Sequence, residues 1–291
     1  MPPTPSGHPT PHAVDLTHVL AVAQQAGDLI LAMQARGLQS IGSKSSAIDL
    51  VTEADIAAEK LIRSELARRY PAVGFWGEES NQPPDSEFFW VVDPIDGTIN
   101  FANGLAYFAV NIALNRRDLT LLGVTLELPA RRLFFVQRDR GAFRREADGH
   151  DVALQVNHTA DLGRALLSSG FPYHRTEHED NNLAEFAYFL ARTQGVRSMG
   201  TAAMDLANVA CGALAAYWEG WLQPWDAAAG ALLVREAGGK VTDYQGADWT
   251  LTSRTLVASN GQPALHRALL DGIRDARRTL RATLLPTGDP T

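Results

Sequence analysis

Two aspartates three positions apart offer the clearest chemistry in this sequence. Asp93 and Asp96 belong to the run Asp-Pro-Ile-Asp-Gly-Thr, which follows the apolar residues 88–92. A run of aromatic and β-branched residues is typical of a buried strand. Because Pro94 fixes its own φ and favours an extended Asp93, the strand cannot simply continue into a helix, and we expect the chain to turn here. Such a turn can aim both carboxylates at one point.

Gly97 and Thr98 complete this motif with small side chains and free backbone N–H groups at a place where a helix can begin. The N-terminus of a helix is a favourable place for a phosphate group. The alternative is a plain turn at the end of a strand, because Asp, Pro and Gly are ordinary turn formers.

Three further acidic positions have both a structural and a chemical explanation. Glu78 and Glu79 end a short strand. Adjacent strand residues point to opposite sides, so one of them can face a site while the other is solvated. Asp55 and Thr52 match a capping box, which explains Asp55 as part of a helix start. Asp226, in the run Pro-Trp-Asp, stands where the N-cap of a helix belongs.

Convergence of Glu78, Asp93, Asp96 and Asp226 in one cleft would require cations, because unpaired carboxylates repel one another. A ligand set made only of oxygen, without Cys or His, favours Mg²⁺, Mn²⁺ or Ca²⁺ over zinc or copper. A reaction on phosphate esters selects Mg²⁺, which keeps water and phosphate oxygens among its ligands. Two such ions can bracket an in-line displacement at phosphorus.

Four segments in series resemble the inositol monophosphatase family of metal-dependent phosphatases. They are Gly77-Glu78-Glu79-Ser80, the run from Asp93 to Thr98, the run from Gly200 to Ala203, and Trp225-Asp226. Their order and approximate spacing are those of the family, and the similarity extends over residues 28–260. One departure is Ile99, where many members carry Thr. Ile99 follows the ligands, so we expect no effect on the metal chemistry.

The resemblance implies roles for individual residues. The implied metal ligands, for two or three Mg²⁺ ions, are Glu78, Asp93, the carbonyl of Ile95, Asp96 and Asp226. The implied catalytic residues are Thr98, Asp55 and Glu78, with Asp55 accepting a hydrogen bond from Thr98 to polarise the attacking water. The implied substrate contacts are Gly97, Thr98, Gly200, Thr201, Ala202, Glu219 and Asp226. A helix N-cap is the structural alternative for Thr201.

The implied reaction is hydrolysis of a small phosphate monoester by water, without a covalent phosphoenzyme, and myo-inositol monophosphate is the expected substrate. Sister groups on the same scaffold hydrolyse histidinol phosphate, fructose 1,6-bisphosphate or 3′-phosphoadenosine 5′-phosphate. Metal ligands cannot separate these substrates, because they contact only the phosphate. We expect the pocket residues near Tyr173 to Asp180 and Leu222-Gln223 to separate them. Some bacterial relatives act as accessory factors for transcription machinery, so a protein-binding role is the alternative from another class. The resemblance also implies a homodimer.

The order of predicted elements and the resemblance together lead us to expect an α/β fold, layered as an αβαβα sandwich. Consecutive short strands between residues 88 and 156 predict an antiparallel sheet, and helical periodicity predicts helices near 14–33, 182–193, 202–212, 224–238 and 263–273. The expected division is a disordered tail (1–12), an N-terminal α+β domain with most metal ligands (13–157), a C-terminal α/β domain with the substrate pocket (158–275), and a flexible tail (276–291).

Composition narrows the possible partners. The 291 residues are 45% hydrophobic and 20% charged, with a net charge of −7, which is typical of a soluble globular protein. Without a basic stripe we expect no nucleic-acid partner. A single cysteine excludes an intramolecular disulfide and fits the cytosol, and the eight histidines lack zinc-ligand spacing. No apolar run approaches the roughly 20 residues of a membrane span, so we expect a cytoplasmic enzyme.

Overall fold

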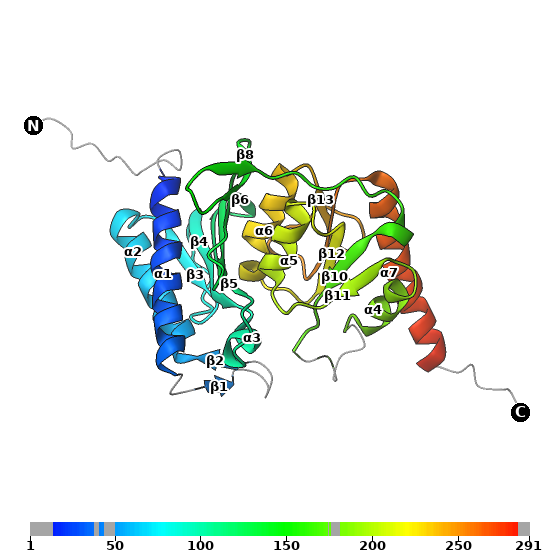
Figure 1. Ribbon diagram of the computed structural model, residues 1–291, viewed down its shortest axis with the longest axis horizontal. Helices are drawn as coiled ribbons and strands as arrows, with labels where there is room; N and C mark the ends of the chain where they lie inside the picture. The colour runs from blue at the N-terminus through cyan, green and yellow to red at the C-terminus, as the bar shows by residue number, and fades with distance from the viewer. Residues whose placement is uncertain (1–13, 38–40, 44–49, 174, 176–180, 285–291) are drawn as a thin grey trace, which may run out of the picture.

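Alternating layers of helices and sheets make up the computed structural model, which describes residues 14–37, 41–43, 50–173, 175 and 181–284. Figure 1 shows helices α1 and α2, a large sheet, helices α5 and α6, a smaller sheet, and helices α4 and α7, in that order. This is the predicted αβαβα sandwich. The predicted tail over residues 1–12 lies outside the described residues. The helix bounds are α1 (Leu16–Arg36), α2 (Glu53–Arg69), α3 (Thr98–Ala102), α4 (Leu183–Leu190), α5 (Ala202–Ala210), α6 (Pro224–Glu236), α7 (Pro263–Leu284) and the 3₁₀ helix η2 (Leu162–Arg164).

The large sheet has the order β3-β4-β5-β6-β7-β8-β9. From β4 onward each strand pairs antiparallel with the next, as predicted, because short links between consecutive strands allow hairpins. Strand β3 pairs parallel with β4. The strand bounds are β3 (Gly74–Gly77), β4 (Phe88–Asp96), β5 (Phe108–Arg116), β6 (Leu119–Leu128), β7 (Leu133–Gln137), β8 (Gly141–Arg145) and β9 (Asp151–Ala153).

The smaller sheet is mixed and has the order β11-β10-β12-β14-β13. Strand β10 pairs parallel with β11 and β12, whereas β14 pairs antiparallel with β12 and β13. A separate hairpin joins β1 and β2. The strand bounds are β10 (Leu166–Ser169), β11 (Gly195–Arg197), β12 (Ala216–Gly220), β13 (Lys240–Thr242), β14 (Thr255–Ser259), β1 (Ile41–Ser43) and β2 (Leu50–Thr52).

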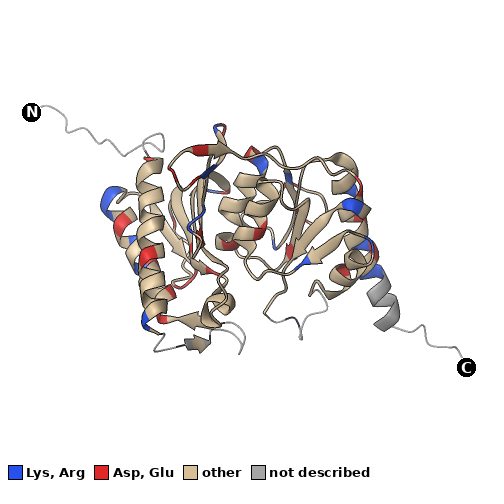
Figure 2. Ribbon diagram, in the orientation of Figure 1, with Lys and Arg blue, Asp and Glu red and all other residues tan. Residues whose placement is uncertain are grey.

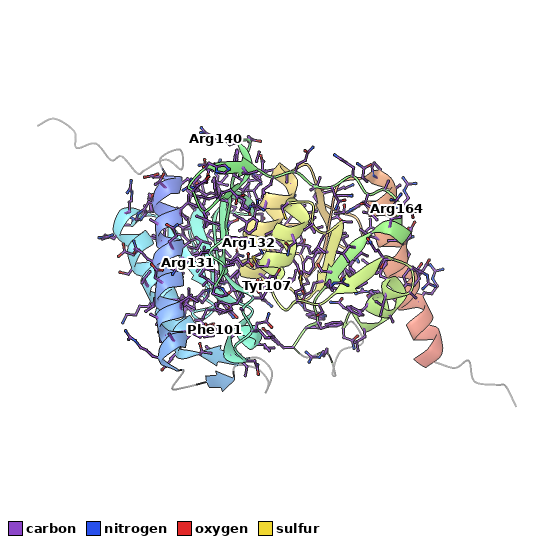
Figure 3. The ribbon with its side chains drawn as sticks, viewed as in Figure 1. Phe101, Tyr107, Arg131, Arg132, Arg140 and Arg164 are labelled. Carbon is purple, nitrogen blue, oxygen red and sulfur yellow. The ribbon has the colours of Figure 1, made fainter. Side chains whose placement is uncertain are left out.

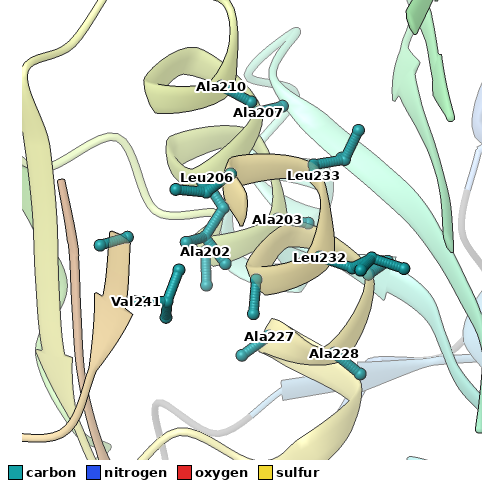
Figure 4. Packing of buried hydrophobic residues seen from close by; sticks show 14 of the residues in the cluster. Ala202, Ala203, Leu206, Ala207, Ala210, Ala227, Ala228, Leu232, Leu233 and Val241 are labelled. Carbon is teal, nitrogen blue, oxygen red and sulfur yellow. The ribbon is translucent and has the colours of Figure 1, made fainter. Parts of the chain in front are cut away.

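Small side chains allow α5 and α6 to pack closely between the two sheets. Figure 4 shows Leu206 of α5 beside α6, with alanines of both helices in the same buried cluster. Gly230 of α6 lies against Leu206 so closely that a Cβ there would be 2.6 Å from the Leu206 Cβ. Residues of both sheets join this cluster, so the middle layer connects the two halves of the chain through one core.

Hydrogen bonds between the layers tie the start of α6 and the last turn of α5 to the large sheet and its flank. Asn111 of β5 donates from Nδ2 to the carbonyl oxygen of Trp225 at 2.6 Å. Its Oδ1 accepts from the hydroxyl of Thr125 at 2.8 Å, which holds the amide in this orientation. The hydroxyl of Tyr107, labelled in Figure 3, accepts from Nδ2 of Asn208 in α5 at 2.8 Å. These contacts position the first turn of α6 against the strand next to β4.

Helix α1 is long and apolar enough to cross a membrane by length and composition alone, although the sequence pattern predicted no such segment. Core helices of soluble proteins meet the same criteria. In this fold Val19, Ala23, Ala26 and Ile30 of α1 are fully buried in the same cluster as residues of α2 and the large sheet. The apolar face of α1 therefore belongs to the protein core.

Charged residues of both signs alternate along the outer helices. In Figure 2 Lys and Arg are interspersed with Asp and Glu on both α2 and α7. Arg63 pairs with Glu59 one turn away in α2, and Arg274 pairs with Asp271 in α7. Neither helix presents a basic stripe of the kind that follows a nucleic-acid backbone.

Helix α7 extends beyond the predicted end of the C-terminal domain at residue 275. It runs to Leu284, so residues 276–284 are helical where the sequence pattern predicted a flexible tail. Ala276 is buried and continues the spacing of the buried residues Leu265, Leu269 and Ile273. The apolar stripe that holds the helix on the small sheet is therefore longer than the predicted segment. Residues 285–291 lie outside the described residues.

Candidate active site

A bulge in β4 brings Asp93 and Asp96 to one side of the sheet. Asp93 pairs with Asn111 of β5 and Asp96 pairs with Ala109, so β4 advances three residues while β5 advances two. In a regular strand residues three apart point to opposite faces, whereas the extra residue of a bulge restores the same face. The predicted turn at Pro94 is therefore wrong in position, because the strand continues to Asp96.

The chain turns at Gly97, directly after this bulge. Gly97 has φ 96°, in the left-handed region that favours glycine, and it precedes the short helix α3. A Cβ on Gly97 would lie 3.2 Å from the carbonyl oxygen of Gly200, so the absence of a side chain also lets two distant loops approach. The motif thereby meets the start of α5 across the gap between the two halves.

One cavity of about 850 Å³ contains nearly all the predicted site residues. Its lining includes the predicted metal ligands Glu78, Asp93, Ile95, Asp96 and Asp226. It also includes the predicted substrate contacts Gly97, Thr98, Gly200, Thr201, Ala202 and Glu219. The residues come from β4, α3, the end of β12 and the starts of α5 and α6, so both halves of the chain build the cavity.

Asp55 does not line the cavity but lies buried behind Thr98. Its Oδ2 accepts from the backbone N–H of Thr52 at 2.8 Å, so Asp55 completes the capping box of α2. Its Oδ1 is 3.4 Å from the hydroxyl of Thr98, which is 3.0 Å from the carbonyl oxygen of Ile95. The hydroxyl has one hydrogen for two acceptors. Both explanations of Asp55, the helix cap and the partner of Thr98, are compatible with this geometry.

The two glutamates after β3 face different surroundings. Glu78 lines the cavity, and its backbone N–H continues the pairing with β4 by donating to the carbonyl oxygen of Val92 at 3.0 Å. The backbone N–H of Glu79 donates to Oε2 of Glu59 in α2 at 2.8 Å. Of the pair, the structure thus brings Glu78 to the predicted site.

Asp226 is not the N-cap of α6, as the sequence pattern had predicted. Gln223 is the N-cap, and Asp226 is the third residue of the helix. Its Oδ2 accepts from the backbone N–H of Gln223 at 2.7 Å, which is the return bond of a capping box. Pro224 occupies the first helical position, where its missing N–H costs nothing. The side chain still lines the cavity.

Thr201 is the N-cap of α5, and it also reaches Asp96. Its hydroxyl accepts from the backbone N–H of Met204 at 3.3 Å and donates to Oδ2 of Asp96 at 2.5 Å. The backbone N–H of Ala203 donates to the same carboxylate oxygen at 2.6 Å. The first turn of α5 therefore holds a carboxylate of the opposite half of the chain.

The buried carboxylates raise one another's pKa values. Burial raises the pKa of Asp93 well above its ordinary value, and the charges of Glu78, Asp96 and Asp226 raise it further. Burial raises the pKa of Asp96 to about 6, although hydrogen bonds from Thr201 and Ala203 lower it. Burial, Asp96 and Glu78 raise the pKa of Asp226. A cation among these groups would stabilise their ionised forms.

The donor set suits Mg²⁺ in chemistry, because its members offer only carboxylate and carbonyl oxygens. Among the described residues no group of three or more His, Cys, Asp and Glu side chains is arranged to hold a metal ion as it stands. Two of the carboxylates have hydrogen-bond partners within the protein: Asp96 accepts from Thr201 and Ala203, and Asp226 accepts from Gln223.

A second acidic group in the cavity includes a residue that the sequence analysis missed. The hydroxyl of Tyr217 donates to Glu219, and burial raises the pKa of Glu219 to about 8. Asp205 of α5 also lines the cavity, is 2% exposed, and has a pKa raised by burial and by Glu219. An Asp among the apolar residues of a buried helix was the available signal for it.

Two segments that were expected to separate the substrates, residues 173–180 and 222–223, contribute Tyr173, Arg175, Leu222 and Gln223 to the lining, and residues 174 and 176–180 lie outside the described residues. The lining residues that the sequence analysis missed are Phe171, Leu183 and Trp221. Ile99, noted only as a departure from the family motif, also lines the cavity and is 37% exposed. No local pattern marks these residues, because they meet only through the connections between strands and helices.

Comparisons with known proteins agree with this geometry. Residues 14–278 match the model of the inositol monophosphatase family. An inositol-1-monophosphatase of Synechocystis sp. is 42% identical over 80% of this chain and 79% of its own length. A relative from Pseudomonas aeruginosa named Nus factor SuhB is 38% identical over 84% and 91%. The solved structure of an inositol monophosphatase from Anabaena (Nostoc) sp. has a TM-score of 0.79 and 34% identity, covering 89% of this chain and 95% of its own. The chain belongs to the inositol monophosphatase family.

Proposed function

We propose that the cavity is the active site of an Mg²⁺-dependent phosphatase that hydrolyses myo-inositol monophosphate to inositol and phosphate. The observation that carries this proposal is the meeting of Glu78, Asp93, Asp96 and Asp226 around one cavity, where burial and neighbouring acids raise the pKa values of the three aspartates. A cluster of acids without a paired cation is costly in a buried site. Mg²⁺ ions would supply the missing positive charge and would leave coordination positions for the oxygens of a phosphate ester.

Two or three Mg²⁺ ions would be held by Glu78, Asp93, the carbonyl of Ile95, Asp96 and Asp226. Bound there, Mg²⁺ supplies positive charge that favours ionisation of water and stabilises charge on the leaving oxygen. The hydrogen bonds from Thr201 and Ala203 keep one Asp96 oxygen ionised and oriented. The main chain of the bulge orients Asp93, whose Oδ1 accepts from the N–H of Ile95 at 3.0 Å.

The remaining residues position the reactants. Thr98, backed by Asp55 and the Ile95 carbonyl, would orient the attacking water through its hydroxyl. The N–H groups of Gly97 and Thr98 would bind phosphate oxygens. Contacts to the alcohol would come from Gly200, Thr201, Ala202, Glu219 and Asp226. No described residue needs to form a covalent bond with phosphorus, because water is the nucleophile in this scheme.

The experiment that tests the proposal measures phosphate release from a panel of esters with Mg²⁺ and with EDTA. The panel consists of myo-inositol 1-phosphate, histidinol phosphate, fructose 1,6-bisphosphate and 3′-phosphoadenosine 5′-phosphate. We expect Mg²⁺-dependent release with the highest kcat/KM for the inositol ester. A higher kcat/KM for another ester would contradict the proposed substrate but would still support a phosphatase. Release that persists in EDTA would contradict the metal requirement.

A second candidate function is binding to a partner protein, because a relative at 38% identity bears the name Nus factor SuhB. The substitution Asp93→Asn separates the two functions, since it removes a proposed metal ligand from inside the cavity and alters no exposed surface. Capture of the same bacterial partner by wild type and by Asp93→Asn supports a role independent of catalysis. Failure of both to capture any partner opposes it.

We further propose a cytoplasmic homodimer, in line with the family resemblance. Light scattering coupled to size-exclusion chromatography measures the mass directly. A mass of twice 31.6 kDa is the expected result, and a mass equal to one chain contradicts it.

A further inference from the structure

The lining of the cavity includes large apolar side chains as well as acids. Leu183 and Tyr173 line it and are 52% and 40% exposed, and Trp221 and Leu222 line it as well. The proposed metal and hydroxyl contacts use none of these four residues. Large apolar side chains that remain exposed at a concave site gain free energy when a ligand displaces water from them.

The backbone of Trp221 has a conformation that bulky residues rarely adopt. Its φ is 70°, in the left-handed region. Its N–H donates to the carbonyl oxygen of Arg254 at 2.5 Å, and the Arg254 guanidinium lies 5.3 Å from the centre of the indole ring. Strained conformations of this kind persist where the surroundings hold them, and they are concentrated at binding sites.

Trp221 also occupies a defined place relative to the proposed chemistry. It lies two residues after Glu219, at the end of β12, and two residues before Gln223, the N-cap of α6. Both flanking segments carry proposed substrate contacts, Glu219 and Asp226. The cavity of about 850 Å³ is near the upper end of the range for small-molecule sites, so it has room for a group beyond the phosphate and its nearest hydroxyls.

We infer that Trp221, together with Leu183 and Tyr173, determines specificity by binding a flat apolar ring face carried by the alcohol part of the substrate. This inference rests on the proposed phosphatase function and deepens it. The preferred substrate class is phosphate monoesters of ring-bearing alcohols, over esters of open-chain polyols. Aromatic side chains bind ring faces by stacking, in addition to the effect of burying apolar surface.

The test compares two primary alkyl esters, 2-phenylethyl phosphate and glycerol 1-phosphate, with Mg²⁺. The measured quantity is the ratio of their kcat/KM values. Trp221→Asn removes the ring, and Asn adopts left-handed φ values readily, so the backbone conformation is kept. Trp221→Phe keeps a ring. Leu119→Ala is the control, because Leu119 is 44% exposed and does not line the cavity.

We expect the wild type to prefer the phenylethyl ester, and Trp221→Asn to lower the ratio about tenfold, mainly through KM. Trp221→Phe should keep most of the preference, and Leu119→Ala should keep all of it. Leu183→Ser, at a position exposed enough to tolerate it, is a second variant that should lower the ratio if Trp221→Asn does not fold.

A wild type without preference, or variants that leave the ratio unchanged, overturns the inference while the phosphatase function stands. An equal loss of kcat/KM for both esters, accompanied by a lower Tm, indicates a merely structural Trp221 and also overturns it. A wild type that releases phosphate from neither of these esters nor from myo-inositol 1-phosphate overturns the proposed function, and the inference with it.

Discussion

The hydroxyl of Thr201 donates a hydrogen bond to Oδ2 of Asp96 across 105 positions of sequence, at a distance of 2.5 Å. Asp96 ends the central motif strand of the large sheet, and Thr201 is the N-cap of a helix in the middle layer. One side chain thus closes a helix end and holds a proposed metal ligand. The hydrogen bond from Thr201 lowers the pKa of Asp96, whereas burial raises it.

Replacing Thr201 tests this double role. Thr201→Val keeps the size of the side chain but removes the helix cap and leaves an oxygen of Asp96 without its partner. We expect the free energy of unfolding to fall by about 2 kcal/mol, measured by urea denaturation. We also expect a weaker apparent affinity for Mg²⁺ in the phosphate-release assay. Thr201→Ser is the matched control, because it keeps the hydroxyl. A Val variant with the stability of the Ser variant contradicts the double role.

Replacing Asp93 should separate activity from stability. Asp93→Asn removes a buried carboxylate whose ionised form is opposed by burial and by three neighbouring acids. We therefore expect the variant to lose Mg²⁺-dependent phosphate release but to have, in EDTA at pH 7.5, a Tm at least as high as the wild type. Calorimetry and the release assay provide the two measurements.

The control for Asp93→Asn is Asp118→Asn, at an exposed position in the turn between β5 and β6. Asp118→Asn should change neither the rate of phosphate release nor the Tm. A lower Tm for Asp93→Asn in EDTA would show that Asp93 mainly supports the fold, and unchanged turnover would remove it from the proposed metal site.

The layers and the acidic motifs were predictable from sequence because they depend on local patterns. Consecutive short strands predict hairpins, and the Asp93–Thr98 motif carries its turn residues within six positions. The bulge that brings Asp93 and Asp96 to one face was not predictable, because it depends on pairing with Asn111 and Ala109 of another strand. Pro224 explains why Asp226 is the third helical residue and not the cap, since Pro is favoured at the first position.

Trp221 and Leu183 of the cavity lining were also beyond local reasoning. They come from segments with no shared pattern, whereas Tyr173 lies in a segment that was expected to belong to the substrate pocket. Asp205 offered a weak signal, because it is an acid in an apolar helix. Its interaction with Glu219 becomes apparent only in the folded structure, where β12 packs beside α5. Residues that act through distant partners need the tertiary structure before they can be identified.

The metal-free protein should lose stability as the pH rises. Folding raises the pKa of Asp96 from its ordinary 3.8 to about 6, and it raises the pKa values of Asp93 and Asp226 in the same direction. At these three acids the folded state therefore binds more protons than the unfolded state between pH 3.8 and the raised folded-state pKa values. The stability contributed by these protonated acids is present at low pH and is lost as the pH rises through the folded-state values.

Mg²⁺ should reverse this trend, because it binds the ionised carboxylates. We expect the Mg²⁺-induced increase in Tm to grow between pH 5.5 and pH 8, measured by thermal unfolding with Mg²⁺ and with EDTA. In Asp93→Asn the increase should be smaller at every pH. An increase in Tm that is equal at pH 5.5 and pH 8 would mean that the cation binds elsewhere.

Glu219 depends on a glycine in the neighbouring strand region. A Cβ on Gly170 would lie 1.9 Å from Oε2 of Glu219, which is closer than any real contact. Because the obstructing atoms are the end of a flexible side chain, Gly170→Ala should displace the Glu219 carboxylate and leave the fold intact. We expect KM for myo-inositol 1-phosphate to rise about tenfold, as for the loss of a hydrogen-bond partner, with a small change in Tm.

Gly163→Ala is the matched control, because a Cβ there meets no atom closer than 3.4 Å and its backbone is not in the left-handed region. It should leave both KM and Tm near the wild-type values. Glu219→Gln keeps the shape of the displaced group and should raise KM to a similar extent as Gly170→Ala. If Gly170→Ala raises KM while Glu219→Gln does not, the effect arises from the loop around residue 170, and Glu219 loses its proposed contact with the alcohol.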